Sequence, residues 1–385
     1  MLNYGIILIK GITMTYLIDK IVWEVTAKCN MNCMHCGSDC NCDVKGEELS
    51  TAECLQVLED IKEVGGCNLI TFSGGEPLLR EDLGVLTSRC NLFDFKTAVI
   101  SNAFMVNEKT IKMIKALNLL AYGISIDAAD PYMHDYIRGV PHAFEHVEKA
   151  IKLLNENNIV PTIVTTVHKL NYNQLPKIRD FLIKNNVKLW QIQYGDNIGR
   201  MPKDCQITEA QYLEIAKFIL DTNKNYSKCF KRVSGADVFG YMSPFAKQLQ
   251  GFWQGCLGGI SFVGISAEGS VRGCLSMQSD KYIEDNVRNR SFKEIWLDKN
   301  SFAYNRKFDC SMLTGYCRTC IYAATCKGGC MRAASLHGGR NSQYCLYKIE
   351  KEGFSSPLQA RTEFSKQEIF DLYNPIRKLP DEFWK

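Results

Sequence analysis

Short apolar runs alternate with amphipathic stretches along the chain from position 20 to about position 225. The apolar runs are rich in β-branched residues, which indicates buried strands, while the stretches between them carry apolar residues at helical spacing. The predicted strands are Ile21–Ala27, Asn68–Ser73, Phe95–Ser101, Ala121–Asp127, Ile159–Val167 and Lys188–Gly195.

Two of the intervening stretches carry clear helix starts. Ser50 with Glu53, and Thr208 with Gln211, have the spacing of capping boxes ahead of apolar residues. Strand–helix units in series imply parallel strands with right-handed crossovers, and hence an α/β fold. Periodicity alone is compatible with both a doubly wound sheet and a partial barrel.

The pattern changes after about position 226, where glycine and cysteine become frequent and the strands shorten. Ser291 with Glu294 starts one short helix and Ser365 with Glu368 another. The core of this second region is too thin to be stable alone, as in small units that depend on bound metal. We predict an N-terminal extension (1–19), a first domain (20–225), a linker (226–250), a cysteine-rich domain (251–350) and a tail (351–385). Met1 to Thr13 carries no recognisable element, and Met14 is an alternative start.

Composition narrows the function classes. The chain has 385 residues, 46% of them hydrophobic, and a net charge of +4, which argues weakly against nucleic acid as the main partner. No stretch approaches the roughly 18 apolar residues of a membrane span. The apolar run Gly5 to Ile9 is too short for a signal peptide. We therefore expect a cytoplasmic protein whose 18 cysteines mostly bind metal rather than form disulfides.

Three cysteines, Cys29, Cys33 and Cys36, follow the first predicted strand with the spacing Cx3Cx2C. In parallel α/β sheets, ligands collect at the carboxyl ends of strands, so one loop can wrap these thiolates around a metal centre. Structural zinc takes four protein ligands. Three thiolates instead suit a [4Fe–4S] cluster whose fourth iron binds something else.

This motif resembles the signature of the radical S-adenosylmethionine (SAM) enzymes. The resemblance implies a partial (β/α)6 barrel of the TIM type in which SAM binds the free iron. One electron then cleaves SAM, and the resulting 5′-deoxyadenosyl radical abstracts hydrogen from a substrate. His35 departs from the commonest pattern, which has an aromatic carbocycle before the last cysteine; an imidazole can still stack near the adenine.

Further motifs at strand ends match the same family. "SGGEP" (Ser73 to Pro77) resembles the motif that faces the methionyl amine, where adjacent glycines allow close approach and Glu76 offers a carboxylate to an ammonium. "QYGDNIGR" (Gln193 to Arg200) resembles a segment beside the adenine. Arg138 matches a guanidinium that pairs with the SAM carboxylate. The SAM-contacting residues that the resemblance implies are Gly74, Gly75, Glu76, Ser101, Asn102, Ser125, Asp127 and Arg138.

A second set of cysteines resembles the SPASM extension of radical SAM enzymes that act on peptides. It comprises Cys256, Cys274, Cys317, Cys320, Cys326, Cys330 and Cys345, with Gly269 between the first two. The resemblance implies two auxiliary iron–sulfur clusters of the [4Fe–4S] type, and three clusters in total. One would be bound by Cys317, Cys320, Cys326 and Cys345, and the other by Cys256, Cys274 and Cys330. The latter takes its fourth ligand from Cys310 or leaves that iron open, and a zinc ribbon is the competing interpretation. We interpret Cys40 and Cys42 as unligated thiols.

The SPASM set and the "HCGS" sequence after the first cluster favour a maturase that installs a crosslink or related oxidation in a ribosomal precursor peptide. Its partners would be that peptide, a reductase, flavodoxin or ferredoxin as electron donor, and a separate leader-binding protein. A sulfatase maturase ranks lower because Leu275 stands where those relatives place an aspartate. A peptide epimerase and a non-enzymatic electron-transfer protein are further alternatives. The general base is not identified by the sequence.

Overall fold

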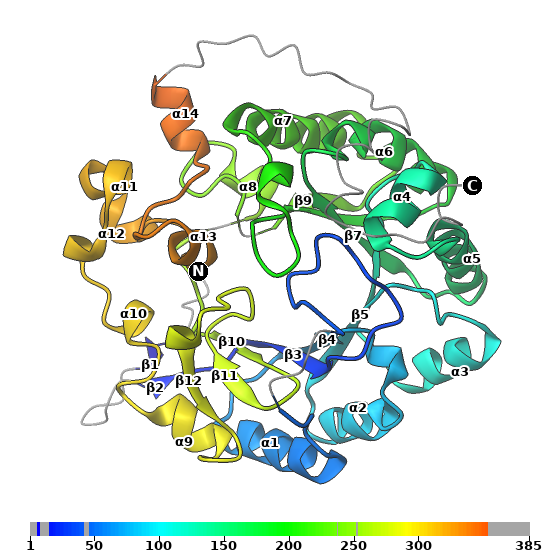
Figure 1. Cartoon of the computed structure of the whole chain (residues 1–385), viewed down its shortest axis with the longest axis horizontal. Coiled ribbons are helices and arrows are strands. Elements are labelled where there is room, and N and C mark those ends of the chain that lie inside the picture. The colour runs from blue at the N-terminus through cyan, green and yellow to red at the C-terminus, as the bar shows by residue number, and fades with distance from the viewer. Residues whose placement is uncertain (1–5, 8–14, 42–45, 237, 252, 353–385) are drawn as a thin grey trace.

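A computed structural model describes residues 6–7, 15–41, 46–236, 238–251 and 253–352. Its centre is a curved ten-stranded sheet in the order β12-β11-β10-β3-β4-β5-β6-β7-β8-β9, with helices on its outer face (Figure 1). The sheet has two ends, β12 and β9, so the barrel is partial, as predicted.

The six predicted strands are all present and run parallel, each paired with the next. They are β3 (Lys20–Thr26), β4 (Leu69–Gly74), β5 (Lys96–Ser101), β6 (Ala121–Ser125), β7 (Pro161–Val167) and β8 (Leu189–Tyr194). Their outward side chains form the main core with the helices. In β3, for example, Ile21, Trp23 and Val25 are fully buried and alternate with partly exposed residues on the inner face. The inner face is therefore left to line a cavity.

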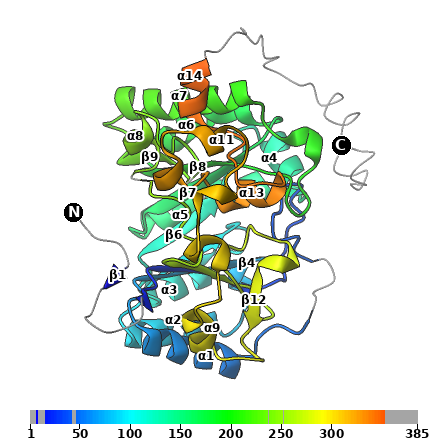
Figure 2. The ribbon, with the colours of Figure 1, turned by 90° about the vertical axis from the view of Figure 1, so that its left-hand side faces the viewer.

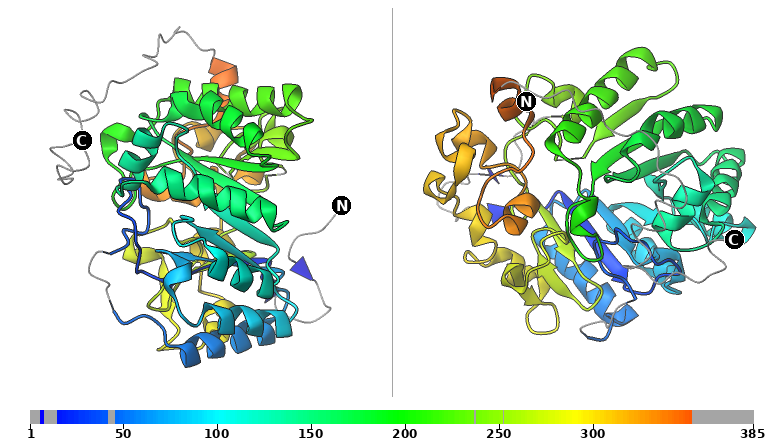
Figure 3. Two further views of the ribbon diagram at one scale, coloured as in Figure 1. Left: turned by 90° about the vertical axis from the view of Figure 1, so that its right-hand side faces the viewer. Right: turned by 45° about the horizontal axis from the view of Figure 1, so that its top comes forward.

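Helices connect these strands and cover the outside of the barrel (Figure 3). They are α1 (Thr51–Val64), α2 (Leu83–Leu92), α3 (Glu108–Ala116), α4 (Pro131–Arg138), α5 (Ala143–Glu156), α6 (Leu175–Lys184) and α7 (Glu209–Asn225), with the short turns η1 (Pro77–Leu79), η2 (Tyr172–Gln174) and η3 (Lys203–Cys205). The predicted capping boxes are confirmed at Ser50, Thr208 and Ser291.

The segment predicted as a linker, 226–250, carries regular structure. β9 (Arg232–Gly235) pairs in parallel with β8, and α8 (Ala246–Leu249) follows it. The sheet thus gains a parallel strand beyond the six that the periodicity predicts. A strand of only four residues is too short to give a periodic signal.

The C-terminal region continues the same sheet. β10 (Phe262–Ile265) pairs in parallel with β3, and β11 (Ser270–Arg272) and β12 (Ile283–Asn286) follow in antiparallel order. Short helices then run along one side of the barrel (Figures 1 and 2). They are η4 (Asp280–Tyr282), α9 (Phe292–Leu297), α10 (Ala303–Arg306), η5 (Cys310–Met312), α11 (Gly315–Thr319), α12 (Ala323–Cys326), α13 (Met331–Leu336) and α14 (Leu346–Glu352).

The two chain ends are described only in part. β1 (Ile6–Ile7) pairs with β2 (Thr15–Tyr16), so a strand lies in the part of the N-terminal extension where no element was predicted. The helix predicted at Ser365 lies outside the described residues, as does nearly all of the predicted tail. Within the described part of the chain, no helix is long and apolar enough to cross a membrane.

Candidate active site

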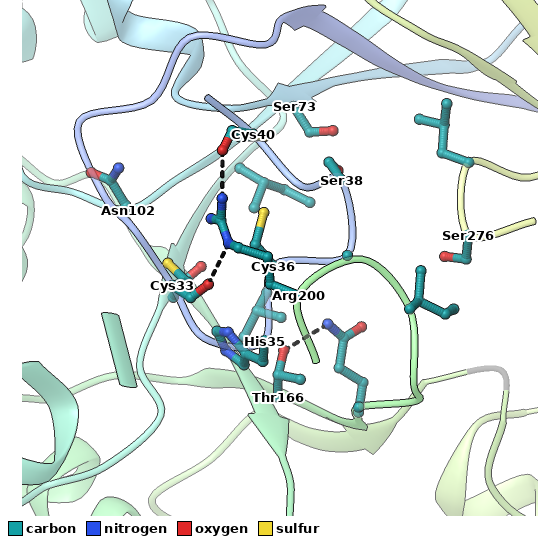
Figure 4. Close-up of a pocket in the computed structure, with 18 of the residues that line it drawn as sticks. Cys33, His35, Cys36, Ser38, Cys40, Ser73, Asn102, Thr166, Arg200 and Ser276 are labelled. Carbon is teal, nitrogen blue, oxygen red and sulfur yellow. Dashed lines mark hydrogen bonds between the residues drawn. The ribbon is translucent and has the colours of Figure 1, made fainter. Parts of the chain in front are cut away.

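The three cysteines of the first motif line one cavity of about 380 Å³ at the carboxyl ends of the strands. Figure 4 labels two of them, Cys33 and Cys36. Their loop follows β3 directly. Asn41 holds the start of the loop, since its Oδ1 accepts from the backbone N–H of Cys29 and its Nδ2 donates to the Cys29 carbonyl, both at 2.8 Å. The structure therefore brings Cys29, Cys33 and Cys36 together as predicted.

Arg200 ties this loop to the opposite side of the barrel. Its Nε donates to the Cys33 carbonyl at 3.0 Å, and its backbone N–H donates to the Cys36 carbonyl at 3.0 Å. Gly199 precedes it with φ +56°, and a Cβ there would lie 2.2 Å from the Cys36 carbonyl oxygen. The family resemblance places Arg200 in a segment beside the adenine and implies no individual role for it. Its position just past the end of β8 was the available signal.

The glycine pair of "SGGEP" packs against the strand end that leads into Cys29. Gly74 and Gly75 both line the cavity. A Cβ on Gly74 would lie 2.2 Å from the Thr26 carbonyl oxygen, and one on Gly75 would lie 2.0 Å from that of Lys28. Only glycine fits at these two positions, because the atoms in the way belong to the backbone.

Glu76 lies behind the glycines rather than on the cavity wall. It is fully buried, and its carboxylate accepts from Ser101 Oγ at 2.9 Å, Asn102 N at 2.8 Å and Leu78 N at 3.1 Å. Burial raises the pKa of Glu76 to about 7. The contact between Glu76 and the ammonium of SAM stays a prediction. In the structure Glu76 positions Ser101 and Asn102, which line the cavity.

Asp127 also supports its neighbours from outside the cavity wall. It is fully buried and pairs with Arg138 at 2.7 Å and with His35 Nε2 at 2.8 Å. Burial alone would raise the pKa of Asp127, but the Arg138 and His35 charges outweigh burial and hold this pKa well below its usual range. Ser125, from the end of β6, lies on the wall.

Arg138 lies on the cavity wall beside the cysteine loop. One of its terminal nitrogens is 3.8 Å from Cys33 Sγ, while its Nε is buried without a partner. A buried donor of this kind calls for an acceptor. An anionic group in the cavity, such as the carboxylate of SAM, would supply it. The thiols, the glycine pair and this donor together fit a cluster and its bound SAM.

Cys40 is a fourth thiol at the cavity. It is buried, lies on the wall and hydrogen-bonds to the thiol of Cys36. Cys42 lies outside the described residues. Because Cys40 contacts Cys36, either thiol is close enough to be tested as the third ligand of the N-terminal cluster.

We expect Cys36→Ala to lose the N-terminal cluster and Cys40→Ala to keep it. If the chain binds three [4Fe–4S] clusters, iron and sulfide per chain should fall by roughly a third in the first variant only. Metal analysis and Mössbauer spectra of anaerobically reconstituted protein check this. Equal iron loss in both variants would show that Cys40 is a ligand.

The cysteines of the C-terminal region form the two expected groups. Cys317, Cys320, Cys326 and Cys345 line one small pocket with Tyr316 and Tyr322. In the other group, the Cys256 and Cys330 thiols share a hydrogen bond, and Cys274 adjoins Cys256. Cys310 is exposed on η5. Among the described residues, no three His, Cys, Asp or Glu side chains are arranged to hold a single metal ion.

The group that contains Cys256 adjoins the cavity. Leu275 and Ser276, which follow Cys274, and Arg332, which follows Cys330 by two positions, lie on the cavity wall. Arg332 pairs with Asp196 at 2.8 Å across the interface between barrel and C-terminal region. The cavity therefore lies between the N-terminal cysteines and the group that contains Cys256.

Comparisons with known proteins match both halves of this arrangement. The radical SAM superfamily model matches residues 23–182, and a model of an iron–sulfur cluster-binding (SPASM) domain matches residues 256–321. An AdoMet-dependent heme synthase of Oleidesulfovibrio alaskensis is 30% identical over 353 residues, which cover 86% of this chain and 88% of that protein. The chain belongs to the radical SAM superfamily.

Other radical SAM relatives differ in what their names say they act on. An AdoMet-dependent heme synthase of Methanosarcina barkeri is 27% identical, covering 89% of this chain and all of that protein. A PqqA peptide cyclase of Granulibacter bethesdensis is 25% identical, covering 80% of each chain. The family assignment therefore establishes a radical SAM enzyme with a SPASM domain and leaves the substrate open.

Two solved structures share the fold. Streptococcus suis SuiB bound to the precursor peptide SuiA gives a TM-score of 0.67 at 17% identity, covering 86% of this chain and 75% of SuiB. The enzyme anSMEcpe with AdoMet and the Cp18Cys peptide gives 0.66 at 16% identity, covering 95% of this chain and 99% of the other. At such low identity these likenesses support the radical SAM barrel with its SPASM domain and no more.

Proposed function

We propose that this radical SAM enzyme oxidises a peptide, installing a crosslink or a related modification in a ribosomal precursor. Bound at the N-terminal cluster, SAM would supply the radical that abstracts a hydrogen atom from the substrate. The supporting observation is the cavity, whose walls come from both the barrel and the C-terminal region. The chain's own residues would hold the substrate there and exclude water.

The chemistry of the cavity wall suits an uncharged backbone. Gln191 and Gln193 of β8, Thr166 of β7 and Ser276 lie on it. These groups can donate to and accept from peptide amides. The Gln193 side chain donates to Thr166 Oγ1 at 3.0 Å, so its own carbonyl oxygen is directed away from that contact. This wall supports recognition of amide groups rather than of charges.

The arginines of the described wall each contact the protein. Arg138 pairs with Asp127, Arg332 pairs with Asp196, and Arg200 donates to the Cys33 carbonyl. Arg138 Nε and Arg332 Nη2 are nevertheless buried without a hydrogen-bond acceptor among the described residues. These donors can serve a peptide carbonyl as well as a carboxylate.

A test of this function is mass spectrometry of short peptides that are encoded beside the gene and co-expressed with the enzyme. We expect each crosslink to remove two hydrogens from one of these peptides, and the Cys36→Ala enzyme to leave every mass unchanged. An unchanged mass for all such peptides with the wild-type enzyme would refute the proposal. An external electron donor and a leader-binding protein are part of the proposal and are tested by omission from the assay.

A heme precursor is the second candidate substrate. It is supported by the relatives named AdoMet-dependent heme synthase and by an Fe-coproporphyrin III synthase of Methanosarcina barkeri, 26% identical over 87% of this chain. Offering Fe-coproporphyrin III to the reconstituted enzyme distinguishes the two. SAM-dependent loss of this porphyrin with no modified peptide would replace the first candidate by the second.

A further inference from the structure

Glu24 lies on the inner face of β3, toward the cavity. Its neighbours Trp23 and Val25 are fully buried on the outer face, whereas Glu24 keeps part of its surface exposed. Across the sheet Glu24 is paired with Ser73 of β4, and Ser73 lines the cavity. Because side chains directly opposite each other in a sheet point to the same face, Glu24 points the same way as Ser73.

Glu24 is also the one acidic residue in strands β3 to β8, all of which the structure describes. The inner positions of the other strands near the cavity carry neutral groups such as Ser125, Val164 and Gln191. The charged groups on the cavity wall, Arg138, Asp196, Arg200 and Arg332, all come from outside these strands. A carboxylate within the strands costs desolvation energy and calls for a reason.

The carboxylate is hydrogen-bonded to a residue of the cysteine loop. Ser38 Oγ donates to Glu24 Oε1, and Ser38 itself lines the cavity (Figure 4). Ser38 thus stands between the carboxylate and the space where a substrate would bind. This arrangement allows a proton to pass from the cavity through the hydroxyl to Glu24.

The surroundings of Glu24 favour its protonated form. The pKa of Glu24 is raised to about 7, mainly by burial. The nearby Glu268 and Cys36 raise this pKa as well, whereas the hydrogen bond from Ser38 and the charge of Arg272 lower it. A group of this pKa exchanges a proton near neutral pH, which suits general acid–base chemistry.

Other carboxylates near the site have charged or multiple partners. The oxygens of Glu76 accept three hydrogen bonds, and Asp127 is paired with Arg138 and His35. Asp196, which lies on the cavity wall, is paired with Arg332 at 2.8 Å. Among the described residues, Glu24 differs from these three because a hydroxyl alone donates to its carboxylate, and a hydroxyl can relay a proton.

We propose that Glu24 accepts, through the hydroxyl of Ser38, the proton that the substrate releases as its radical is oxidised. This inference rests on the proposed function. The first hydrogen atom leaves with the SAM-derived radical. As the substrate radical closes its new bond, it loses one electron and one proton. An iron–sulfur cluster held by Cys256, Cys274 and Cys330 would take the electron. The proton goes to the Ser38 hydroxyl as Ser38 passes its own proton to Glu24.

The test compares wild type with Glu24→Gln, Ser38→Ala and Ser38→Thr. The readout is modified peptide formed per 5′-deoxyadenosine released. We expect this ratio to fall about 100-fold in Glu24→Gln and Ser38→Ala, with 5′-deoxyadenosine still formed, because positioned acid–base groups contribute 10²–10⁴-fold. Ser38→Thr, which keeps a hydroxyl, should restore it. A wild-type ratio in Glu24→Gln would overturn the proposal, and a wild-type ratio in Ser38→Ala would overturn the relay.

Structural loss is separated from proton transfer by two controls. Glu48 is a carboxylate beside the same strand end that accepts from Thr26 and from the Ala27 N–H, both at 2.8 Å, and it is not on the described wall. Glu48→Gln should keep the wild-type ratio. Iron content and the cluster's electron paramagnetic resonance spectrum with SAM should match wild type in all of these variants.

The pH dependence gives a readout that a purely structural role would not change. Only the carboxylate form of Glu24 accepts a proton, so the product ratio should rise with pH through about 7. Glu268→Gln removes a negative charge that raises the Glu24 pKa, and it should move this rise to lower pH. An unmoved profile would contradict the proposal.

A substrate-free measurement keeps this inference separate from the proposed function. Burial raises the pKa of both Glu24 and Glu76 to about 7, so infrared titration of the reconstituted holoenzyme should show carbonyl stretches of protonated carboxyls that disappear as pH rises through neutrality. The component that belongs to Glu24 should be absent in Glu24→Gln. No Glu24-dependent band would overturn the inference. If the band is present but no peptide is modified, the peptide substrate fails instead.

Discussion

Gly75→Ala is expected to remove both the N-terminal cluster and SAM binding. The new Cβ would lie 2.0 Å from the Lys28 carbonyl oxygen and 2.5 Å from its carbon, and neither atom can move unless the loop into Cys29 moves. We expect a destabilisation of about 3 kcal/mol, the upper end of overpacking costs. Denaturant unfolding of the apo-protein and iron analysis after reconstitution measure the two effects.

Gly84→Ala is the matched control, because Gly84 lies in α2 and a Cβ there would meet its nearest atom, in Leu117, at 4.0 Å. A gain of up to about 1 kcal/mol is expected from helix propensity. If Gly75→Ala keeps wild-type stability and iron content, the loop can shift to accommodate the methyl group and the prediction is wrong.

Asp127→Asn is expected to destabilise the fold by about 3 kcal/mol. The substitution leaves Arg138 buried without its counter-charge, and breaking a buried pair typically costs 3–5 kcal/mol. The pKa of Asp127 is lowered in the folded state, so its stabilisation is present above the unfolded pKa of about 3.9 and is lost as pH falls below it. The difference between wild type and variant should therefore shrink in acid.

Asp180→Asn provides the comparison for this pair. Asp180 pairs with Arg179 at 3.1 Å, but its side chain is 67% exposed. Exposed pairs contribute about 1 kcal/mol at most. Equal unfolding free energies for the two variants at neutral pH would contradict the role assigned to Asp127. Retained SAM binding in Asp127→Asn would show that Arg138 keeps its position without the pair.

The strands, capping boxes and cysteine groups could be predicted because each depends on how particular residue types are spaced along the sequence. The six parallel strands alternate with helices, and Ser50, Thr208 and Ser291 cap helices as their sequence neighbours indicate. The cysteines of the C-terminal region, spread over 90 positions of sequence, gather as their order predicts. Spacing was sufficient in these cases because the family's motifs encode it.

Roles that depend on side-chain direction could not be predicted. The motifs place Glu76 and Asp127 at the site, but their partners within the protein, Ser101 for Glu76 and Arg138 for Asp127, became known only from the structure. Arg200 acts through carbonyls of a loop some 160 positions earlier. Glu24 was missed because a carboxylate inside a strand gives no sign of which face it occupies until the register is known.

Because β10 is hydrogen-bonded directly to β3, the SPASM domain is no detachable appendage. The N–H groups of Asp19 and Lys20 donate to the Ser261 carbonyl at 2.8 and 3.1 Å, just before the strand that delivers Cys29. A chain truncated before residue 251 would expose β3 as a bare edge, open to pairing with another copy. In the intact chain, the shared sheet connects the strand before Cys29 to the hairpin between Cys256 and Cys274, so it sets the separation of these two groups of thiols.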